Sequence, residues 1–322
     1  MCDVCGSTSG KTVLQATDHR EGLGGSFELL ECLSCHLVRT EPRPDDLSSW
    51  YPPEYANHTA RPPLTVRAIG RALRYNARPI RNERIARLLG WALPNAEIGP
   101  PLAQQARILD VGAGNGSAVA ALRDAGAEAW GVEPSAVGVD AAHANGIDTV
   151  IQGTLESAPL PEGPWDVIRF THVLEHVPSP VATLRFAQSA LAKDGRIVIL
   201  VPNFGGIGRR IFGRAWDGLE VPRHLHHFTP STLRKTLAAA GLAPLTVRTV
   251  ALFGVLPASI DAWSSGGQRQ RGWGGSLAVR AGLYPLELAT ALVGVGDGIA
   301  VIATRMEAGN QPAEPYTHRA AT

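Results

Sequence analysis

Between residues 105 and 201 short apolar runs alternate with longer segments in which apolar side chains recur at helical spacing. A short apolar run that is bounded by turn residues predicts a buried strand, and an alternation of such runs with helices predicts a parallel sheet. The sheet is therefore expected to be doubly wound, in an α/β fold. The five expected strands are the run that begins at Arg107, then Ala129–Glu133, Thr149–Gln152, Trp165–Phe170 and Arg196–Val201.

The first of these runs leads through Asp110 into a loop with alternating glycines at Gly112, Gly114 and Gly116. Glycine lets the backbone turn sharply and approach a ligand closely, and it places that ligand at the N-terminus of the next helix, expected near 118–125. Such a loop could open an NAD site or an S-adenosylmethionine site, or it could be only a tight turn. NAD loops usually space their glycines as Gly-x-Gly-x-x-Gly, which makes a dehydrogenase the weaker alternative.

The second expected strand ends in a carboxylate, Glu133. An acid at this point can accept hydrogen bonds from both hydroxyls of an adenosine ribose, as it does in dinucleotide-binding folds. The loop and this acid together predict a ligand that contains adenosine.

Five blocks in this order resemble the class I S-adenosylmethionine-dependent methyltransferases, and within them the small-molecule group related to the ubiquinone O-methyltransferases. The resemblance covers residues 105–305 and implies a Rossmann-like methyltransferase sheet, mostly parallel, whose seventh strand at 297–305 is antiparallel. The blocks are Leu109–Gly116, Gly131–Ser135, His172–Val177, Lys193–Arg196 and Val201–Asn203.

The resemblance also assigns the cofactor, S-adenosyl-L-methionine, to particular residues. Asp110 and the glycine loop are expected to hold its methionine portion, and Glu133 its ribose hydroxyls. The acid that usually lies beside the adenine is not evident after the third strand. Further cofactor contacts are expected at Thr154, Leu155 and Thr171.

Histidines concentrate between residues 172 and 227. A neutral alcohol or a carbon acid is a poor nucleophile, and histidine has a suitable pKa for a general base. His172 is predicted to face the place where cofactor and substrate meet, and by resemblance His224 lies in a loop over the substrate pocket. Both are predicted catalytic residues. The structural alternative is that His224 or His227 anchors its loop to a backbone carbonyl. A metal site made of His224, His226 and His227 has poor spacing in an extended loop and lacks a clear carboxylate.

The four cysteines form two Cys-x-x-Cys pairs, with 26 residues between them. This spacing predicts a zinc ribbon with a closed four-sulfur site, so the Zn²⁺ is expected to be structural. Disulfides are the alternative, which a cytosolic location disfavours. The ribbon is expected to cover the substrate mouth or to hold a homodimer. The predicted ligands are Cys2, Cys5, Cys32 and Cys35.

The chain divides into a zinc-ribbon module (1–60), an arginine-rich helical linker (61–100), a methyltransferase domain (101–306) with a lid-like insertion (251–296), and a disordered tail (307–322). Between Arg61 and Leu93 the linker holds eight arginines against one acid, Glu83. It forms either solvated amphipathic helices or, between Arg61 and Arg87, a face for an anionic substrate or a membrane surface. Nucleic acid is not expected as a partner, since only one aromatic side chain that could stack on a base, Tyr75, lies among these arginines.

The overall composition adds little, because the formal net charge is only +1. The N-terminus shows no secretory signal pattern, so a cytoplasmic location is predicted. The apolar tract from Leu283 to Ala303 contains a proline and two acids, which favours a buried helix followed by the last strand over a membrane span.

These observations predict a methyltransferase that moves a methyl group from S-adenosylmethionine to a small molecule or glycan precursor, with O-methylation favoured and histidine as general base. The first alternative is C-methylation of a nucleotide-linked keto-sugar. The alternative from another class is an RNA-binding protein or RNA methyltransferase that uses the ribbon and the arginine helices.

Overall fold

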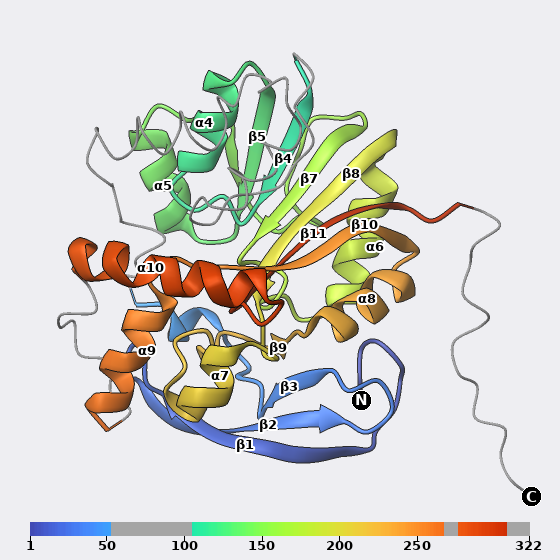
Figure 1. The fold of residues 1–322 in the computed structure, drawn as a ribbon. Coiled ribbons are helices and arrows are strands. Elements are labelled where there is room, and N and C mark those ends of the chain that lie inside the picture. Colours follow the sequence, from blue (N-terminus) through green and yellow to red (C-terminus); the bar gives the residue numbers. More distant parts are fainter. Residues whose placement is uncertain (53–104, 267–275, 308–322) are drawn as a thin grey trace, which may run out of the picture.

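The computed structural model describes residues 1–52, 105–266 and 276–307. A seven-stranded sheet forms the larger part, and a four-stranded sheet lies below it in Figure 1. The strand order in the large sheet is β10-β11-β8-β7-β4-β5-β6. Its strands, in chain order, are β4 (Arg107–Val111), β5 (Glu128–Glu133), β6 (Val150–Gln152), β7 (Trp165–Thr171), β8 (Leu191–Pro202), β10 (Leu242–Val250) and β11 (Gly298–Arg305).

Five neighbouring strands of this sheet run parallel to one another, in the order β6, β5, β4, β7 and β8. The last strand, β11, lies between β8 and β10 and is antiparallel to both. This arrangement confirms the expected sheet and its antiparallel seventh strand. Strand β8 begins five residues before the expected Arg196, because Leu191 already pairs with Trp165; the pairing is irregular there and becomes regular from Arg196.

Side chains alternate between the two faces of the sheet, as the pleat requires. Leu109 packs in a core cluster with residues of α6 (Pro180–Ala190) and α8 (Pro230–Ala239), whereas its neighbour Ile108 packs with residues of α4 (Ser117–Asp124) and α5 (Ala136–Ala144). Helices therefore cover both faces, and the doubly wound prediction is confirmed. Helix α8 begins with a capping box at Thr229.

The N-terminal residues form a small antiparallel sheet of β1 (Gly10–Asp18), β2 (Gly24–Cys32) and β3 (Val38–Glu41). Its fourth strand comes from the other part of the chain, because β9 (His226–His227) pairs with β3. The small sheet thus includes the segment that carries His226 and His227.

The N-terminal module also docks on the helices of the large sheet. The hydroxyl of Ser179 and the amide of Val181, at the start of α6, donate to Asp3 at 2.7 and 2.9 Å. A carboxylate at a helix N-terminus is favourably placed to accept from its unpaired amides. On α8, Lys235 donates to the carbonyl of Cys35 at 3.0 Å.

Three helices, with a 3-10 turn (Gly213–Ala215), lie beside the exits of β8 and β10: α7 (Ile207–Phe212), α9 (Val255–Ser264) and α10 (Leu277–Leu292). The expectation of a buried helix in the apolar tract is wrong for α10, where Glu287 and Ala291 are the buried residues while Leu286 and Leu292 are more than half exposed. The reason is that the carboxylate of Glu287 turns inward and accepts from the amide of Leu256 at the start of α9, 2.9 Å away. Among the described residues, no helix has the length and apolarity to cross a membrane.

Several predictions from the sequence concern residues that the structure does not describe. The arginine-rich linker at 61–100 is one of them, together with part of the insertion (267–275) and all but the first residue of the predicted tail. The described parts of the insertion contain α9 and α10. The predicted domain boundaries stay predictions.

Candidate functional site

The glycine loop joins β4 to α4, and hydrogen bonds tie it to the next strand. The amides of Gly112 and Ala113 donate to the carbonyl of Val132 at 2.8 and 2.9 Å. Gly112 has a φ of 70°, and a Cβ on it would lie 2.4 Å from Cγ2 of Val173. Only glycine combines this left-handed backbone with so close a neighbour. The loop therefore lies against the segment that follows β7, where His172 stands.

Glu133 ends β5 and is bonded to this loop. Its carboxylate accepts from the amide of Gly114 at 2.8 Å and from the amide of Ser135 at 2.9 Å. The side chain is buried, and a Cβ on Gly138 would lie 2.8 Å from its Cγ. Backbone donors thus fix this acid beside the glycines, in the place that the sequence predicts for a ribose contact.

Asp110 lies inside β4 and forms an ion pair that the sequence analysis missed. Arg169, directly opposite on β7, places Nη1 3.1 Å from Oδ1 of Asp110, and both side chains are buried. An arginine in the interior of an apolar strand could have indicated this ion pair in the sequence, because a buried charged group requires a partner. Arg169 also donates to the hydroxyl of Thr171 at 3.5 Å, which links another predicted cofactor residue to the pair.

The two residues predicted to border adenine follow β6. The amide of Gly153 donates to the carbonyl of Glu133 at 3.0 Å, so this loop returns to the end of β5. Leu155 is buried in the core, whereas Thr154 is exposed and bonds to Ser157. The predicted cofactor residues therefore gather along the carboxyl ends of β4 to β7, which is where ligands bind in open α/β sheets.

His172 follows β7 directly and has a φ of 55°. Its Nδ1 lies 3.4 Å from a carboxylate oxygen of Glu175, and its side chain is 32% exposed. A non-glycine residue in the left-handed region is uncommon and directs attention to a functional site. Here it turns the chain from the strand toward the glycine loop.

His224 lies in the loop between α7 and α8 and reaches the same carboxylate from the other side. Its Nε2 is 4.0 Å from Glu175 and 3.7 Å from Glu220, and its side chain is only 5% exposed. Its Nδ1 lies 3.0 Å from the carbonyl of Gly218, so this histidine does anchor its loop to a backbone carbonyl, as the structural alternative had it. Burial holds the pKa of His224 well below its ordinary value.

Two further histidines of this loop are buried where β9 joins the N-terminal sheet. His227 lies 2.9 Å from the hydroxyl of Thr40, and His226 lies 3.1 Å from the guanidinium of Arg43. Burial lowers the pKa of each of the two imidazoles to about 3, with the charge of Arg43 contributing at His226. Both therefore belong to the contact between the two sheets.

A buried ionic network holds the same loop under the N-terminal module. Arg223 is fully buried and donates to Asp18 at 2.7 and 3.2 Å, to Glu220 at 3.1 Å and to the carbonyl of Trp50 at 2.9 Å. Arg20 pairs with the other oxygen of Glu220. Burial alone would raise the pKa of Glu220, but the charges of Arg20, His224 and Arg223 outweigh it and hold that pKa well below its usual range.

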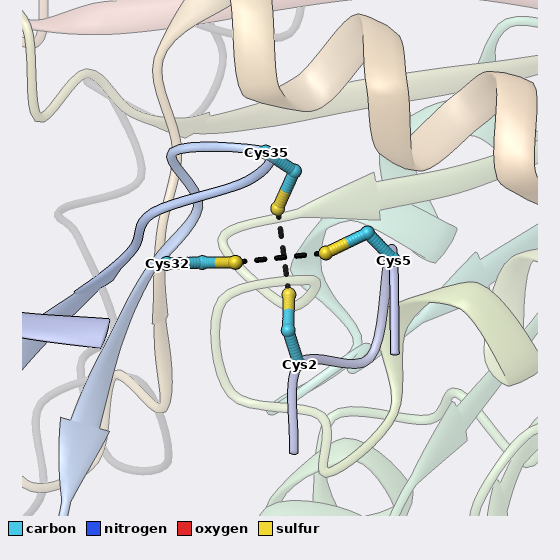
Figure 2. Close-up of side chains that lie close together, drawn as sticks. All are labelled: Cys2, Cys5, Cys32 and Cys35. Atoms are coloured by element: carbon cyan, nitrogen blue, oxygen red, sulfur yellow. Dashed lines mark hydrogen bonds between the residues drawn. The ribbon is translucent and has the colours of Figure 1, made fainter. Parts of the chain in front are cut away.

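The four cysteines point their sulfur atoms toward one another, as Figure 2 shows, and these atoms all lie within 4.8 Å of one another. Cys2 and Cys35 place their sulfur atoms 3.4 Å apart, and Cys5 and Cys32 place theirs 3.5 Å apart. Tetrahedral Zn–S bonds of about 2.3 Å separate sulfur atoms by roughly 3.8 Å, so the cluster fits a zinc ion. No disulfide joins these cysteines. The contact between Cys2 and Cys35 lowers the pKa of Cys2 to about 5 and raises the pKa of Cys35.

Comparison with known proteins identifies the larger part of the chain. The model of a methyltransferase domain family matches residues 71–247, which is more than half of the chain. The chain belongs to this family. The match includes the glycine loop, Glu133 and both histidine segments of this methyltransferase, while the cysteine module lies before it.

Several curated relatives of this methyltransferase bear the same name. The chain is 30% identical over 159 residues to a ubiquinone biosynthesis O-methyltransferase of Bordetella parapertussis. This match covers 44% of the chain and 64% of the relative. A protein of the same name from Xanthomonas euvesicatoria is 28% identical over 149 residues, or 42% of this chain and 62% of the relative. The matched region thus spans just under two thirds of these relatives.

Solved structures similar to this methyltransferase are more distant in sequence. An O-methyltransferase from neocarzinostatin biosynthesis is 17% identical, covers 63% of this chain and 49% of its own, and has a TM-score of 0.40. An S-adenosylmethionine-dependent methyltransferase from Mesorhizobium loti is 21% identical, covers 63% and 94%, and has a TM-score of 0.44.

Proposed function

We propose that this protein transfers a methyl group from S-adenosylmethionine to an oxygen of a small molecule or glycan precursor. Membership in the methyltransferase family supports the reaction class, and the names of the curated relatives favour oxygen as the acceptor atom. The observation that carries the proposal is the carboxylate of Glu133, held 2.8 Å from the amide of Gly114 at the carboxyl end of the sheet.

The cofactor residues proposed from the sequence divide the ligand among them. The glycine loop and Asp110, with its partner Arg169, would hold the methionine portion, Glu133 the ribose hydroxyls, and Thr154 and Leu155 the adenine. Thr171 would complete the set at the end of β7. These residues fit such a ligand, since a loop of alternating glycines and a fixed carboxylate lie side by side. When bound, S-adenosylmethionine supplies an activated methyl group, so correct placement of the acceptor carries most of the catalysis.

His172 is the better supported of the two proposed general bases. Its side chain is 32% exposed against 5% for His224, so a substrate hydroxyl can reach it. Once His172 has taken the proton, the carboxylate of Glu175 beside its Nδ1 would stabilise the imidazolium. His224 is the second candidate, because its Nε2 approaches the same carboxylate.

A methyl-transfer assay tests this function. With S-adenosylmethionine as donor and catechol as a probe acceptor, we expect O-methylated product, and His172→Gln should lower turnover by 100-fold or more. His36→Gln is the matched control, because His36 is an exposed histidine far from β7 in sequence. Methylation of a nucleotide-linked keto-sugar at carbon, with none of catechol, would overturn the O-methylation proposal.

We also propose that the cysteine cluster binds a structural Zn²⁺ and that its module covers the acceptor side of the site. A closed set of four thiolates leaves no coordination position for a substrate. Chelation at moderate temperature should release zinc and unfold the module, because metal binding supplies much of the folding free energy of so small a unit. A far-UV spectrum and a melting curve that stay unchanged without metal would contradict this role.

A further inference from the structure

We propose that Glu175, His176 and His224 form a second metal site, which binds a divalent transition cation such as Zn²⁺ beside the predicted point of methyl transfer. One ligand atom from each of these residues lies within 4.8 Å of the other two. Tetrahedral bonds of about 2.1 Å would separate such atoms by roughly 3.4 Å, so side-chain shifts of about 1 Å close the site.

The carboxylate of Glu175 is the strongest observation. The side chain is 1% exposed, and among the described residues neither of its oxygens receives a hydrogen bond. Its ion-pair contacts in the described part of the chain are with His172 at 3.4 Å and His224 at 4.0 Å, and with no arginine or lysine. Burying an unbonded carboxyl group is costly, so such a group calls for an explanation.

Neighbouring acids show how the chain treats a buried carboxylate elsewhere. Glu220 is paired with Arg20 and Arg223, and Asp18 is paired with Arg223. The charges of Arg20 and Arg223 therefore balance those of Glu220 and Asp18. Neither arginine pairs with Glu175, so another cation would have to neutralise this carboxylate. A metal ion would supply both the charge and the bonds that this carboxylate lacks.

The backbone fixes the two histidines in the form that a metal requires. Nδ1 of His176 lies 3.0 Å from the carbonyl of Arg223 and 2.9 Å from the hydroxyl of Tyr51, which can accept as well as donate. Nδ1 of His224 lies 3.0 Å from the carbonyl of Gly218. A carbonyl only accepts, so each Nδ1 carries the proton and each Nε2 carries the lone pair. Bonds from ligand histidines to backbone carbonyls are the usual support of metal sites.

Backbone bonds also hold the ligands from both sides. The amides of Leu225 and His226 donate to the carbonyl of Glu175 at 2.8 and 3.1 Å, which fixes the loop of His224 to the segment of Glu175. The hydroxyl of Thr40, on β3, donates to the carbonyl of His224 at 2.6 Å. The rings of His176 and His224 meet edge to face, 4.6 Å apart. The cluster is thus held by the large sheet and the N-terminal sheet together.

The donor set determines the class of ion and its role. Two imidazoles and one carboxylate suit Zn²⁺ and similar transition cations, whereas Mg²⁺ and Ca²⁺ prefer oxygen ligands. Three protein ligands leave a position open, unlike the closed cysteine site. On the proposed function, on which this role rests, the ion would bring positive charge to the acceptor oxygen and leave His172 as the proton acceptor. His224 would then be a ligand and not the general base.

Zinc content per chain tests the site. Purified protein is equilibrated with excess Zn²⁺, dialysed against metal-free buffer and analysed by mass spectrometry. Glu175→Gln keeps the shape of the side chain and removes its charge. This variant and the variant His224→Gln should each hold one zinc equivalent less than the wild type. His226→Gln, an equally buried histidine of the same loop outside the site, should hold as much as the wild type.

Equal zinc content in the wild type, Glu175→Gln and His226→Gln would overturn the proposal. If His224→Gln does not fold, the variant Glu175→Gln still tests the site, because the Glu175 substitution removes no hydrogen bond to a described residue. Binding of S-adenosylhomocysteine to the same samples separates this site from the proposed function. A protein that loses one zinc in Glu175→Gln but never binds S-adenosylhomocysteine would keep the metal site and remove the methyltransferase proposal.

Discussion

The two halves of the site are built in different ways. On the glycine-loop side, between β4 and β6, backbone amides and glycines close to one another in sequence make the contacts, as between Gly114 and Glu133. On the histidine side, the contacts join residues up to 205 positions apart, as between Asp18 and Arg223. The first half is determined by a local motif, and the second by the docking of two sheets.

Replacing the central arginine of the histidine side is expected to have the largest effect. Arg223→Met leaves Asp18 and part of Glu220 buried without their partner, and this should lower the free energy of unfolding by about 3 to 5 kcal/mol. Lys11→Met is the matched control, since the pair of Lys11 with Glu31 is exposed and should contribute less than about 1 kcal/mol. Chemical denaturation measures both. A similar small loss in the two variants would mean that the docking does not depend on this network.

This difference explains what could be predicted from the sequence. Glu133 and the glycines lie within one strand-helix-strand unit, where spacing alone locates them. The partners of His224 could not be found in this way, because Glu175 lies 49 positions earlier and comes close only when the loop folds back. A metal site within the 224–227 loop lacks a clear carboxylate, as the sequence indicates, and the carboxylate of the proposed metal site, Glu175, comes from the β7 exit.

The prediction for α10 failed for a related physical reason. Hydropathy alone favoured a buried helix, but Glu287 is bonded to the start of α9, and this fixes which face turns inward. Burial raises the pKa of Glu287 to about 7.

Acid should weaken the histidine side selectively. His226 and His227 have a pKa of about 3 in the folded protein and about 6.5 when unfolded, so the unfolded chain binds more protons. Their contribution is complete above pH 6.5 and is lost as the pH falls toward 3. Between pH 7 and 5 we expect a loss of roughly 2 to 4 kcal/mol for the pair.

Equilibrium unfolding at several pH values measures this loss. In His226→Gln the pH dependence should be less steep than in the wild type, because one of the buried histidines that take up a proton on unfolding is gone. In His36→Gln, which changes an exposed histidine, it should stay as in the wild type. A wild-type stability that is constant from pH 7 to 5 would contradict the burial of these imidazoles.

The glycine-loop side should respond to a smaller change in the backbone. Gly112→Ala combines a left-handed φ with a Cβ 2.4 Å from the side chain of Val173, and it should cost about 2 kcal/mol. Gly126→Ala has the left-handed φ with no heavy atom within 4 Å, so it should cost about 1 kcal/mol. Thermal unfolding compares the two variants. If they are equally stable, the loop does not need the close approach of Val173.

The most direct test of the central claim is calorimetric titration with S-adenosylhomocysteine. The account predicts that the wild type binds and that Glu133→Gln binds about 10- to 100-fold more weakly, since a charged hydrogen bond contributes about 1.5 to 3 kcal/mol. Glu128→Gln, at the exposed opposite end of the same strand, should bind as the wild type does. A folded wild type that does not bind, or equal affinities for Glu133→Gln and Glu128→Gln, would contradict the placement of the cofactor at the glycine loop.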